Sequence, residues 1–202
     1  EKDGWQHLYE LNISDGKIKL LTPGNGEIEN VTVSADRRTV YYTTNIGDID
    51  RRHIWKLSVA NDKTEQLTKG DGIEWSPVIT ANGIAVLHSS AVKPAWPAFV
   101  ENGSVTDIAK EFFPNEFPSN LVQPVSIRIK ATDGREAYAD LFLPPSHKVG
   151  EKHPALIFLH GGSRRQMVLA FHYNQYYSNA YALNQYFASK GYVVLSLNYR
   201  SG

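Results

Sequence analysis

A repeat of 46 residues runs through the first half of this 202-residue chain and restricts the folds open to it. Residues 7–11 (HLYEL) resemble residues 53–57 (HIWKL), and residues 21–24 (LTPG) resemble residues 67–70 (LTKG). Between these marks lie short stretches of alternating apolar and polar residues, separated by Asn, Asp and Gly, which predict β-strands joined by turns. Four short strands in roughly 40 to 50 residues is the period of a β-propeller blade.

Residues 1–124 are long enough for roughly two to three such blades, whereas propellers close with roughly 4 to 8. We therefore expect this half to be the C-terminal part of a propeller whose ring is completed by the remainder of the same polypeptide. A β-sandwich with two similar hairpins is the alternative. The aromatic and histidine residues that recur in the repeat are expected to be packing residues, because each blade buries its inner strands against its neighbours.

The charge distribution separates the two halves of the chain. Residues 1–124 carry 12 basic and 17 acidic side chains, a net charge of −5, and residues 125–202 carry 9 and 4, a net charge of +5. Such an asymmetry predicts two different domains. Basic residues form no cluster longer than a pair, which argues against a nucleic-acid partner.

Several classes of site are disfavoured by composition. The chain has no cysteine, which excludes disulfides, thiolate metal sites and cysteine nucleophiles within it. The seven histidines show no metal-ligand spacing, and no glycine-rich phosphate loop is present, so we expect no metal and no cofactor. We expect no membrane span and no signal peptide at the first residues. Cytoplasmic and periplasmic or secreted locations both stay open, as does oligomerisation.

A proline-rich stretch separates the halves. Residues 93–124 contain five prolines and several aromatic residues. Because proline lacks the N–H that a β-ladder needs, we expect this stretch to be a linker and not the interior of a sheet.

The second half, residues 125–202, has the pattern of a mixed α/β sheet. A hairpin with an Asp-Gly turn at residues 133–134 is followed by the apolar run 154–159, which predicts a strand buried on both faces. A helix is expected next, with Ser178 or Asn179 as its N-cap, with Ala180, Leu183 and Phe187 on its buried face, and with Gly191 ending it. Residues 192–200 predict a second buried strand. Hairpin, strand, helix and strand together open a mostly parallel sheet.

The most informative motif is the sequence His160-Gly161-Gly162 at the carboxyl end of the first predicted buried strand. Reacting groups of open α/β sheets lie beyond those strand ends. Two glycines there let the backbone approach a substrate and turn its N–H groups toward a developing negative charge. No Gly-x-Ser-x-Gly nucleophile motif occurs in the chain.

Residues 153–162 (HPALIFLHGG) and 191–200 (GYVVLSLNYR), after propeller-type repeats, resemble the prolyl oligopeptidase family of serine peptidases, in its dipeptidyl-peptidase and acylaminoacyl-peptidase-like branch. The resemblance covers the chain from end to end. Two departures are Ser163, where members usually have proline, and Ser201-Gly202, where many read Gly-Ser. The family implies a propeller followed by the N-terminal part of an α/β-hydrolase domain, and hydrolysis of short peptides by a Ser-Asp-His triad beyond residue 202.

The resemblance also implies roles for the His-Gly-Gly turn. Gly162 is expected to give a backbone N–H to the oxyanion hole, with Gly161 permitting the turn and His160 orienting the loop. Ser163, Arg164 and Arg165 are candidates for contact with the substrate. The chain alone is expected to be inactive. A carboxylesterase of the His-Gly-Gly type and a non-catalytic propeller binding module are the alternatives.

Overall fold

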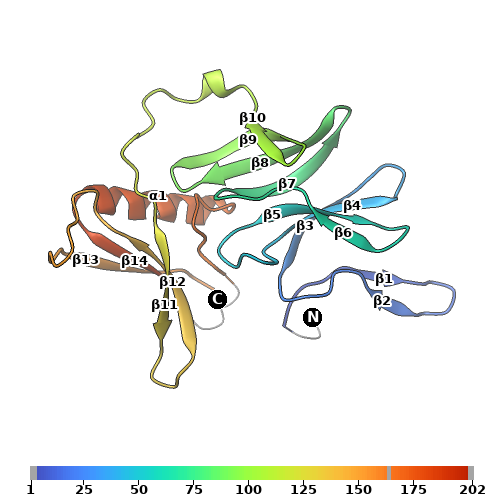
Figure 1. The fold of residues 1–202 in the computed structure, drawn as a ribbon, viewed down its shortest axis with the longest axis horizontal. Coiled ribbons are helices and arrows are strands. Elements are labelled where there is room, and N and C mark those ends of the chain that lie inside the picture. Colours follow the sequence, from blue (N-terminus) through green and yellow to red (C-terminus); the bar gives the residue numbers. More distant parts are fainter. Residues whose placement is uncertain (1–3, 163–164, 200–202) are drawn as a thin grey trace. The chain divides into compact units, whose positions relative to one another are not determined.

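The structure is a computed structural model that describes residues 4–162 and 165–199. Strands predominate in this part of the chain, with one α-helix and one short 3-10 helix (Figure 1). In chain order the elements are β1 (Tyr9–Leu11), β2 (Ile18–Leu20), β3 (Ile28–Val33), β4 (Thr39–Thr44), β5 (His53–Ser58), β6 (Lys63–Gln66), β7 (Ile73–Thr80), β8 (Gly83–Ser90), β9 (Lys93–Glu101), β10 (Ser104–Asp107), η1 (Lys110–Phe112), β11 (Val125–Lys130), β12 (Glu136–Phe142), β13 (Ala155–Leu159), α1 (Gln175–Ser189) and β14 (Val193–Asn198).

The chain divides into two compact units. The first contains Glu1–His88 and Trp96–Lys110, and the second contains Ser89–Ala95 and Glu111–Gly202. Strands β1 and β2 pair with each other, β3 to β6 form a four-stranded antiparallel sheet in chain order, and β7 to β10 form another four-stranded sheet in chain order. Consecutive four-stranded sheets of this kind make a propeller-like all-β region.

The sequence repeat is also a repeat of contacts. In each copy the threonine of the Leu-Thr-x-Gly motif accepts a 2.9 Å hydrogen bond from a main-chain N–H that lies 14 residues earlier. The pairs are Leu8 with Thr22 and Ile54 with Thr68. The similarity at an offset of 46 residues therefore reflects one local structure built twice.

The two copies differ at one buried position. The first copy has the apolar Ile28, and the second has Glu74, which is only 2% exposed. A carboxylate in such a place needs partners. Thr68 donates its hydroxyl hydrogen to Glu74 at 2.6 Å, and Nδ1 of His53 lies 2.9 Å from the same carboxylate oxygen. His53 is thus a buried packing residue, as the repeat predicts, with a polar contact of its own.

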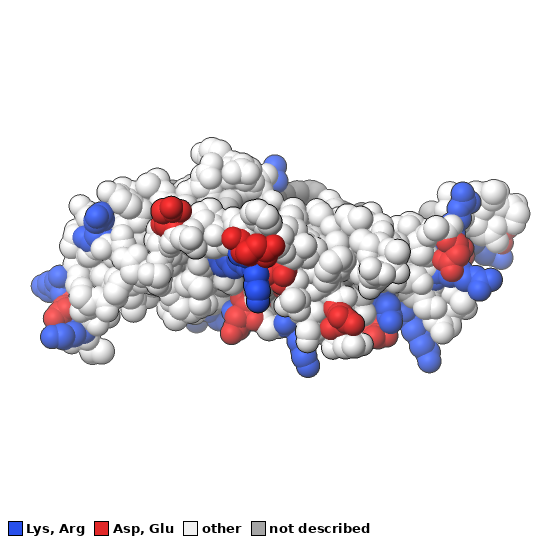
Figure 2. Space-filling model, turned by 90° about the horizontal axis from the view of Figure 1, so that it is seen from above, with Lys and Arg blue, Asp and Glu red and all other residues white. Residues whose placement is uncertain are grey.

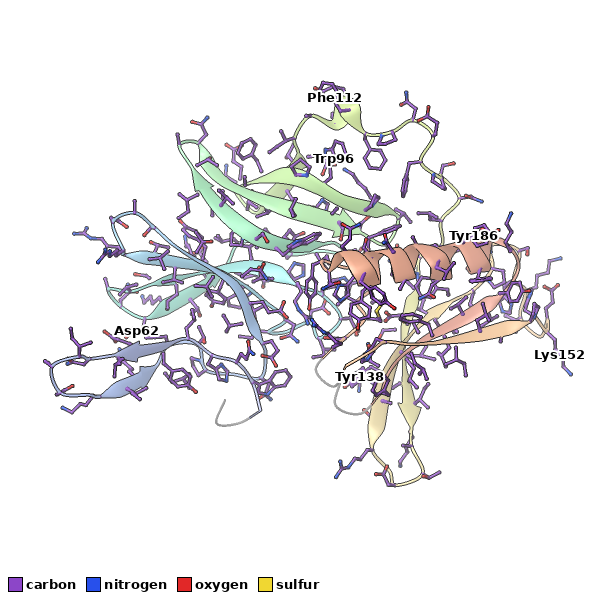
Figure 3. The ribbon with its side chains drawn as sticks, turned by 180° about the vertical axis from the view of Figure 1, so that it is seen from behind. Asp62, Trp96, Phe112, Tyr138, Lys152 and Tyr186 are labelled. Carbon is purple, nitrogen blue, oxygen red and sulfur yellow. The ribbon has the colours of Figure 1, made fainter. Side chains whose placement is uncertain are left out.

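The linker predicted over residues 93–124 is wrong in its first part, because residues 93–101 form β9, an inner strand between β8 and β10. Pro97 gives its carbonyl to the N–H of Ile108 but has no N–H to return. The indole N–H of Trp96 donates instead to the carbonyl of Ile108 at 2.7 Å (Figure 3). A side chain therefore replaces the missing ladder donor, and the strand tolerates its proline.

The second unit contains one sheet, in the order β11-β12-β14-β13. Strands β11 and β12 form the predicted hairpin around Asp133-Gly134, β12 pairs with β14 antiparallel, and β13 pairs with β14 parallel. Helix α1 connects β13 to β14 and packs on one face of the sheet (Figure 1). The core there joins aromatic residues of the helix to apolar residues of the strands, among them Phe142, Tyr181 and Val194.

Helix α1 begins earlier than the sequence predicted. Its N-cap is Asn174, whose side chain accepts a 3.0 Å hydrogen bond from the N–H of Tyr176. The predicted end at Gly191 is confirmed: Gly191 has φ of +89°, its N–H bonds to Ala188, and the N–H of Tyr192 bonds to Phe187. These two bonds form a Schellman motif.

The buried face of α1 also differs from the prediction. Leu183 is 51% exposed, and the buried residues are Tyr177, Tyr181, Asn184, Gln185 and Ala188. This face is partly polar because it binds main-chain carbonyls of other segments in the same unit. The Gln185 amide donates to the carbonyls of Ala91 and Val122. Of the residues predicted for the buried face, Phe187 packs against the core and Leu183 does not, so apolar periodicity located this face only in part.

Strand β13 is not buried on both faces, as its apolar run had suggested. Ile157 is 67% exposed and Leu159 is 58% exposed. In the described part of the chain, β13 lies at the edge of its sheet, and α1 covers the opposite face. Leu156 and Phe158, the residues that alternate with the exposed ones, pack against the α1 core.

Charged side chains are interspersed on the face shown in Figure 2, where lysine and arginine alternate with aspartate and glutamate.

None of the helices formed by the described residues is long and apolar enough to cross a membrane.

Candidate functional site

The candidate site is the turn His160-Gly161-Gly162, which begins directly after β13. Because β13 and β14 run parallel, the carboxyl ends of both strands meet at the same edge of the sheet. Leu159 and Leu197 are register partners there, so Asn198, the last residue of β14, and Tyr199, which follows it, lie beside the turn that follows β13. The fold thus brings together residues almost forty positions apart in the sequence.

Tyr199 holds the turn from the side of β14. Its hydroxyl lies 2.6 Å from the carbonyl oxygen of His160 and 3.0 Å from that of Gly162. A tyrosine hydroxyl has a single hydrogen, so the two carbonyls share it. The ring of Tyr199 also stacks on the ring of His160, with centroids 4.4 Å apart and planes inclined by 14°.

Tyr177 holds the turn from the first helical turn of α1. Its hydroxyl donates a 2.8 Å hydrogen bond to the carbonyl oxygen of Gly161. The ring is buried in the α1 core, which fixes where the hydroxyl can reach. The carbonyl oxygens of all three residues of the turn are therefore engaged by tyrosine hydroxyls.

Asn198 anchors the loop that leads away from the turn. Its amide oxygen accepts a 2.7 Å hydrogen bond from the N–H of Met167, and its amide nitrogen donates to the Met167 carbonyl at 3.0 Å. Both contacts are buried. The Asn198 amide thus pairs with both main-chain groups of Met167, as a neighbouring strand would in a β-sheet.

His172 closes the same loop before the helix begins. Its Nδ1 accepts a 2.8 Å hydrogen bond from the N–H of Asn174, so its Nε2 carries the hydrogen and donates to the carbonyl of Gln166 at 2.8 Å. This pair of contacts is that of a neutral imidazole. His172 is thereby a structural residue of the loop.

His160 is buried, with 3% of its surface exposed. Burial lowers the pKa of its imidazole below the ordinary value, so the ring is neutral at pH 7. Its Nδ1 lies 3.5 Å from the carbonyl of Gly161, which is at the long limit of a hydrogen bond, and Nε2 has no hydrogen-bond partner among the described residues. The stacking on Tyr199 is its other described contact with the site.

The described backbone gives a reason for glycine at only one of the two positions, Gly162. Gly162 has φ of +76°, a left-handed conformation that strains other residues. A Cβ on Gly161 would lie 3.6 Å from the hydroxyl oxygen of Tyr177, in ordinary contact. Both glycines are exposed, so the turn is open to a ligand.

The other predicted contact residues are only partly described. Arg165 is exposed near the turn, and its side chain lies 3.4 Å from where a Cβ on Gly162 would be. Ser163 and Arg164 lie outside the described residues. In the part of the chain that the structure describes, no three His, Cys, Asp or Glu side chains come close enough to hold a metal ion.

Three residues that hold the turn and its loop were not predicted: Tyr177, Asn198 and Tyr199. Asn198 and Tyr199 lie in the second motif that carries the family resemblance, residues 191–200, so the sequence contained a signal for them. No sequence signal pointed to Tyr177, which lies in a tyrosine-rich segment with many similar neighbours.

One family model matches part of the chain. The model of the dipeptidyl peptidase IV (DPP IV) N-terminal region matches residues 1–95. A probable dipeptidyl peptidase 4 of Aspergillus flavus is 24% identical over 185 residues, which is 83% of this chain and 23% of that protein. Dipeptidyl-peptidase 5 of Porphyromonas gingivalis is 21% identical over 209 residues, which is 98% of this chain and 29% of that protein.

Solved structures show the same fold over nearly the whole chain. A puromycin-hydrolyzing peptidase of Mycobacterium tuberculosis superposes with a TM-score of 0.75 at 18% identity, over 97% of this chain and 30% of that one. A puromycin hydrolase mutant complexed with PGG also superposes with a TM-score of 0.75. The identity is 16%, over 98% of this chain and 30% of that one. The chain thus spans less than a third of the length of these relatives.

Proposed function

We propose, from the similarity of this chain to peptidases of the prolyl oligopeptidase family, that it forms part of a serine peptidase that hydrolyses short peptides. Residues 1–124 would supply the last blades of a propeller, and residues 125–202 the first part of an α/β-hydrolase domain. The remainder of the same polypeptide would supply the other blades and the Ser-Asp-His triad, beyond residue 202.

The observation that carries the proposal is the His160-Gly161-Gly162 turn at the carboxyl end of β13, beside the end of β14. The crossover from β13 through α1 to the parallel strand β14 supports an α/β-hydrolase domain. In such domains the loop at this position gives one N–H to the oxyanion hole.

The chemistry divides between this chain and the rest of the protein. The serine oxygen attacks the scissile carbonyl while the histidine takes its proton, and the negative charge moves onto the carbonyl oxygen. The N–H of Gly162 would donate to that oxygen, with Gly161 permitting the turn. The C–N bond then breaks, the amine leaves with the proton, and water releases the acyl group from the serine.

His160 does not act as an acid or base in this scheme. Its Nε2 is buried without a hydrogen-bond partner among the described residues, and its ring stacks on Tyr199, which supports a role in orienting the loop. Ser163, Arg164 and Arg165 follow the oxyanion turn directly and would contact the substrate beside the scissile bond.

The relatives suggest the kind of substrate. Two carry the name dipeptidyl peptidase, and the structural neighbours hydrolyse puromycin. These names support cleavage of an amide bond in a short peptide or a small aminoacyl compound by the intact protein.

The test compares an amide with an ester. The intact polypeptide is assayed with a chromogenic dipeptide anilide and with the ester of the same dipeptide, and we expect turnover of the anilide. Turnover of the ester without the anilide would identify a carboxylesterase, and turnover of neither would identify a non-catalytic binding module. The 202-residue chain alone should hydrolyse neither, because the nucleophile is absent from it.

A further inference from the structure

We infer that Tyr177 and Tyr199 are positioning residues which fix the direction in which the His160-Gly161-Gly162 turn presents its N–H groups. The inference rests on the proposed function, because that function gives those N–H groups an oxyanion to bind. Neither tyrosine would touch the substrate, since both act through main-chain carbonyls of the turn.

Tyr177 acts on the peptide unit that carries the proposed oxyanion donor. The carbonyl of Gly161 and the N–H of Gly162 belong to one planar peptide group, and no described peptide bond is cis. In a trans peptide these two bonds point in opposite directions. The hydroxyl of Tyr177, 2.8 Å from the Gly161 carbonyl oxygen, therefore directs the Gly162 N–H away from the helix.

Tyr199 acts on the peptide units to either side. Its hydroxyl approaches the His160 carbonyl, which belongs to the same peptide group as the Gly161 N–H, and the Gly162 carbonyl. Successive carbonyls of the turn are thus bound by Tyr199, then Tyr177, then Tyr199. A rotation of the central peptide group would break the bond to Tyr177, and a shift of its neighbours would break the bonds to Tyr199.

The turn needs such restraint because of its composition. Two consecutive glycines have more accessible backbone conformations than any other pair, and both are exposed to solvent. Catalytic donors must be held in place before the charge develops, since a displacement of about 1 Å can cost about a hundredfold in rate. The hydrogen bonds from the two tyrosine hydroxyls restrict the backbone conformations that the glycines could otherwise adopt.

The two tyrosines are themselves held by regular structure. Tyr177 is 7% exposed and packs in the core of its unit beside Met167, Phe171 and Tyr181. Tyr199 follows β14 directly and stacks on His160. Groups supported by a helix and a strand hold a site more firmly than groups on loops.

The experiment replaces single hydroxyls in the intact protein. Tyr177→Phe keeps the packed ring and removes the bond to Gly161, and Tyr199→Phe removes the shared bond to His160 and Gly162. Tyr176→Phe is the matched control, because Tyr176 is the neighbouring helix residue and is 71% exposed. For each variant we measure kcat and KM on the dipeptide anilide and the inhibition constant of a dipeptide aldehyde, which forms a tetrahedral adduct with a nucleophilic serine.

We expect Tyr177→Phe to lower kcat by about tenfold with KM changed less than about twofold, which is less than the loss of a whole oxyanion donor. The aldehyde should bind weaker by the same factor, and this constant does not depend on the fraction of folded enzyme. Tyr199→Phe should act in the same direction, and Tyr176→Phe should behave as wild type.

If both Tyr177→Phe and Tyr199→Phe keep wild-type kcat and wild-type aldehyde affinity, this inference is overturned and the proposed function is not. A lower kcat with unchanged aldehyde affinity would also overturn it, because that pattern reports only loss of folded enzyme. If Tyr177→Phe does not fold, Tyr199→Phe decides, since its ring lies outside the buried core. Wild-type protein that hydrolyses neither substrate would instead overturn the proposed function, and the inference with it.

Discussion

The two units of the chain hold their turns in different ways. In the first unit, Thr22 and Thr68 each bind a main-chain N–H that lies 14 residues earlier, and the same contact appears in both copies of the repeat. In the second unit, the turn at His160 to Gly162 is held by Tyr177 and Tyr199, which come from a helix and from the end of a strand.

The two units should therefore differ in how strongly single substitutions disturb them. A repeated anchor is local, and the loss of one copy leaves the other intact. The anchors of the candidate site join segments 16 to 39 residues apart, and the described residues contain no second copy of them. We expect single substitutions near the turn to have larger local effects than single substitutions of the repeated threonines.

The largest stability effect is expected for Asn198→Ala. The substitution leaves the buried N–H and carbonyl of Met167 without partners, which costs about 3 kcal/mol. Hydrogen exchange of the Met167 amide in the intact protein should therefore become about a hundredfold faster.

The control for this prediction is Asn179→Ala, which changes an exposed asparagine on α1 and should leave exchange at Met167 unchanged. Equal exchange rates in wild type and Asn198→Ala would mean that other groups hold the loop, and the contrast between the two units would be lost.

A smaller pair of effects separates the two copies of the repeat. Thr68→Val removes the acceptor for the Ile54 N–H and also the donor to Glu74, whereas Thr22→Val removes only the acceptor for the Leu8 N–H. We expect costs of about 2 kcal/mol and about 1 kcal/mol. Hydrogen exchange at Ile54 and at Leu8 measures each cost locally.

Equal effects in the two copies would show that the Thr68 hydroxyl contributes nothing through Glu74. A larger effect at Leu8 than at Ile54 would contradict the view that the second copy has the stronger anchor.

The strands of the first unit could be predicted from the sequence because period-2 alternation and turn residues act locally. The proline-rich stretch was misjudged at β9 because the replacement of a ladder donor by the Trp96 indole depends on where Ile108 lies. Sequence rules state that proline lacks a ladder N–H. They do not state that the N–H of another side chain can take its place.

The candidate site could be predicted in part. The His-Gly-Gly motif after an apolar run located the turn, and the second motif located Asn198 and Tyr199 without giving them a role. Which hydroxyl meets which carbonyl depends on the parallel register of β13 with β14 and on the N-cap of α1 at Asn174. The buried face of α1 was predicted only in part for a related reason, because Gln185 is buried with its amide bound to main-chain carbonyls and not for its hydrophobicity.

We propose that this chain supplies a pre-ordered oxyanion turn to a nucleophile that lies elsewhere in the polypeptide. The most direct measurement is to label the intact protein with a fluorophosphonate and to map the adduct by mass spectrometry. We predict a single modified serine beyond residue 202, within a Gly-x-Ser-x-Gly sequence. An adduct on a serine of this chain, Ser163 above all, would contradict the account, and so would an intact protein that forms no adduct.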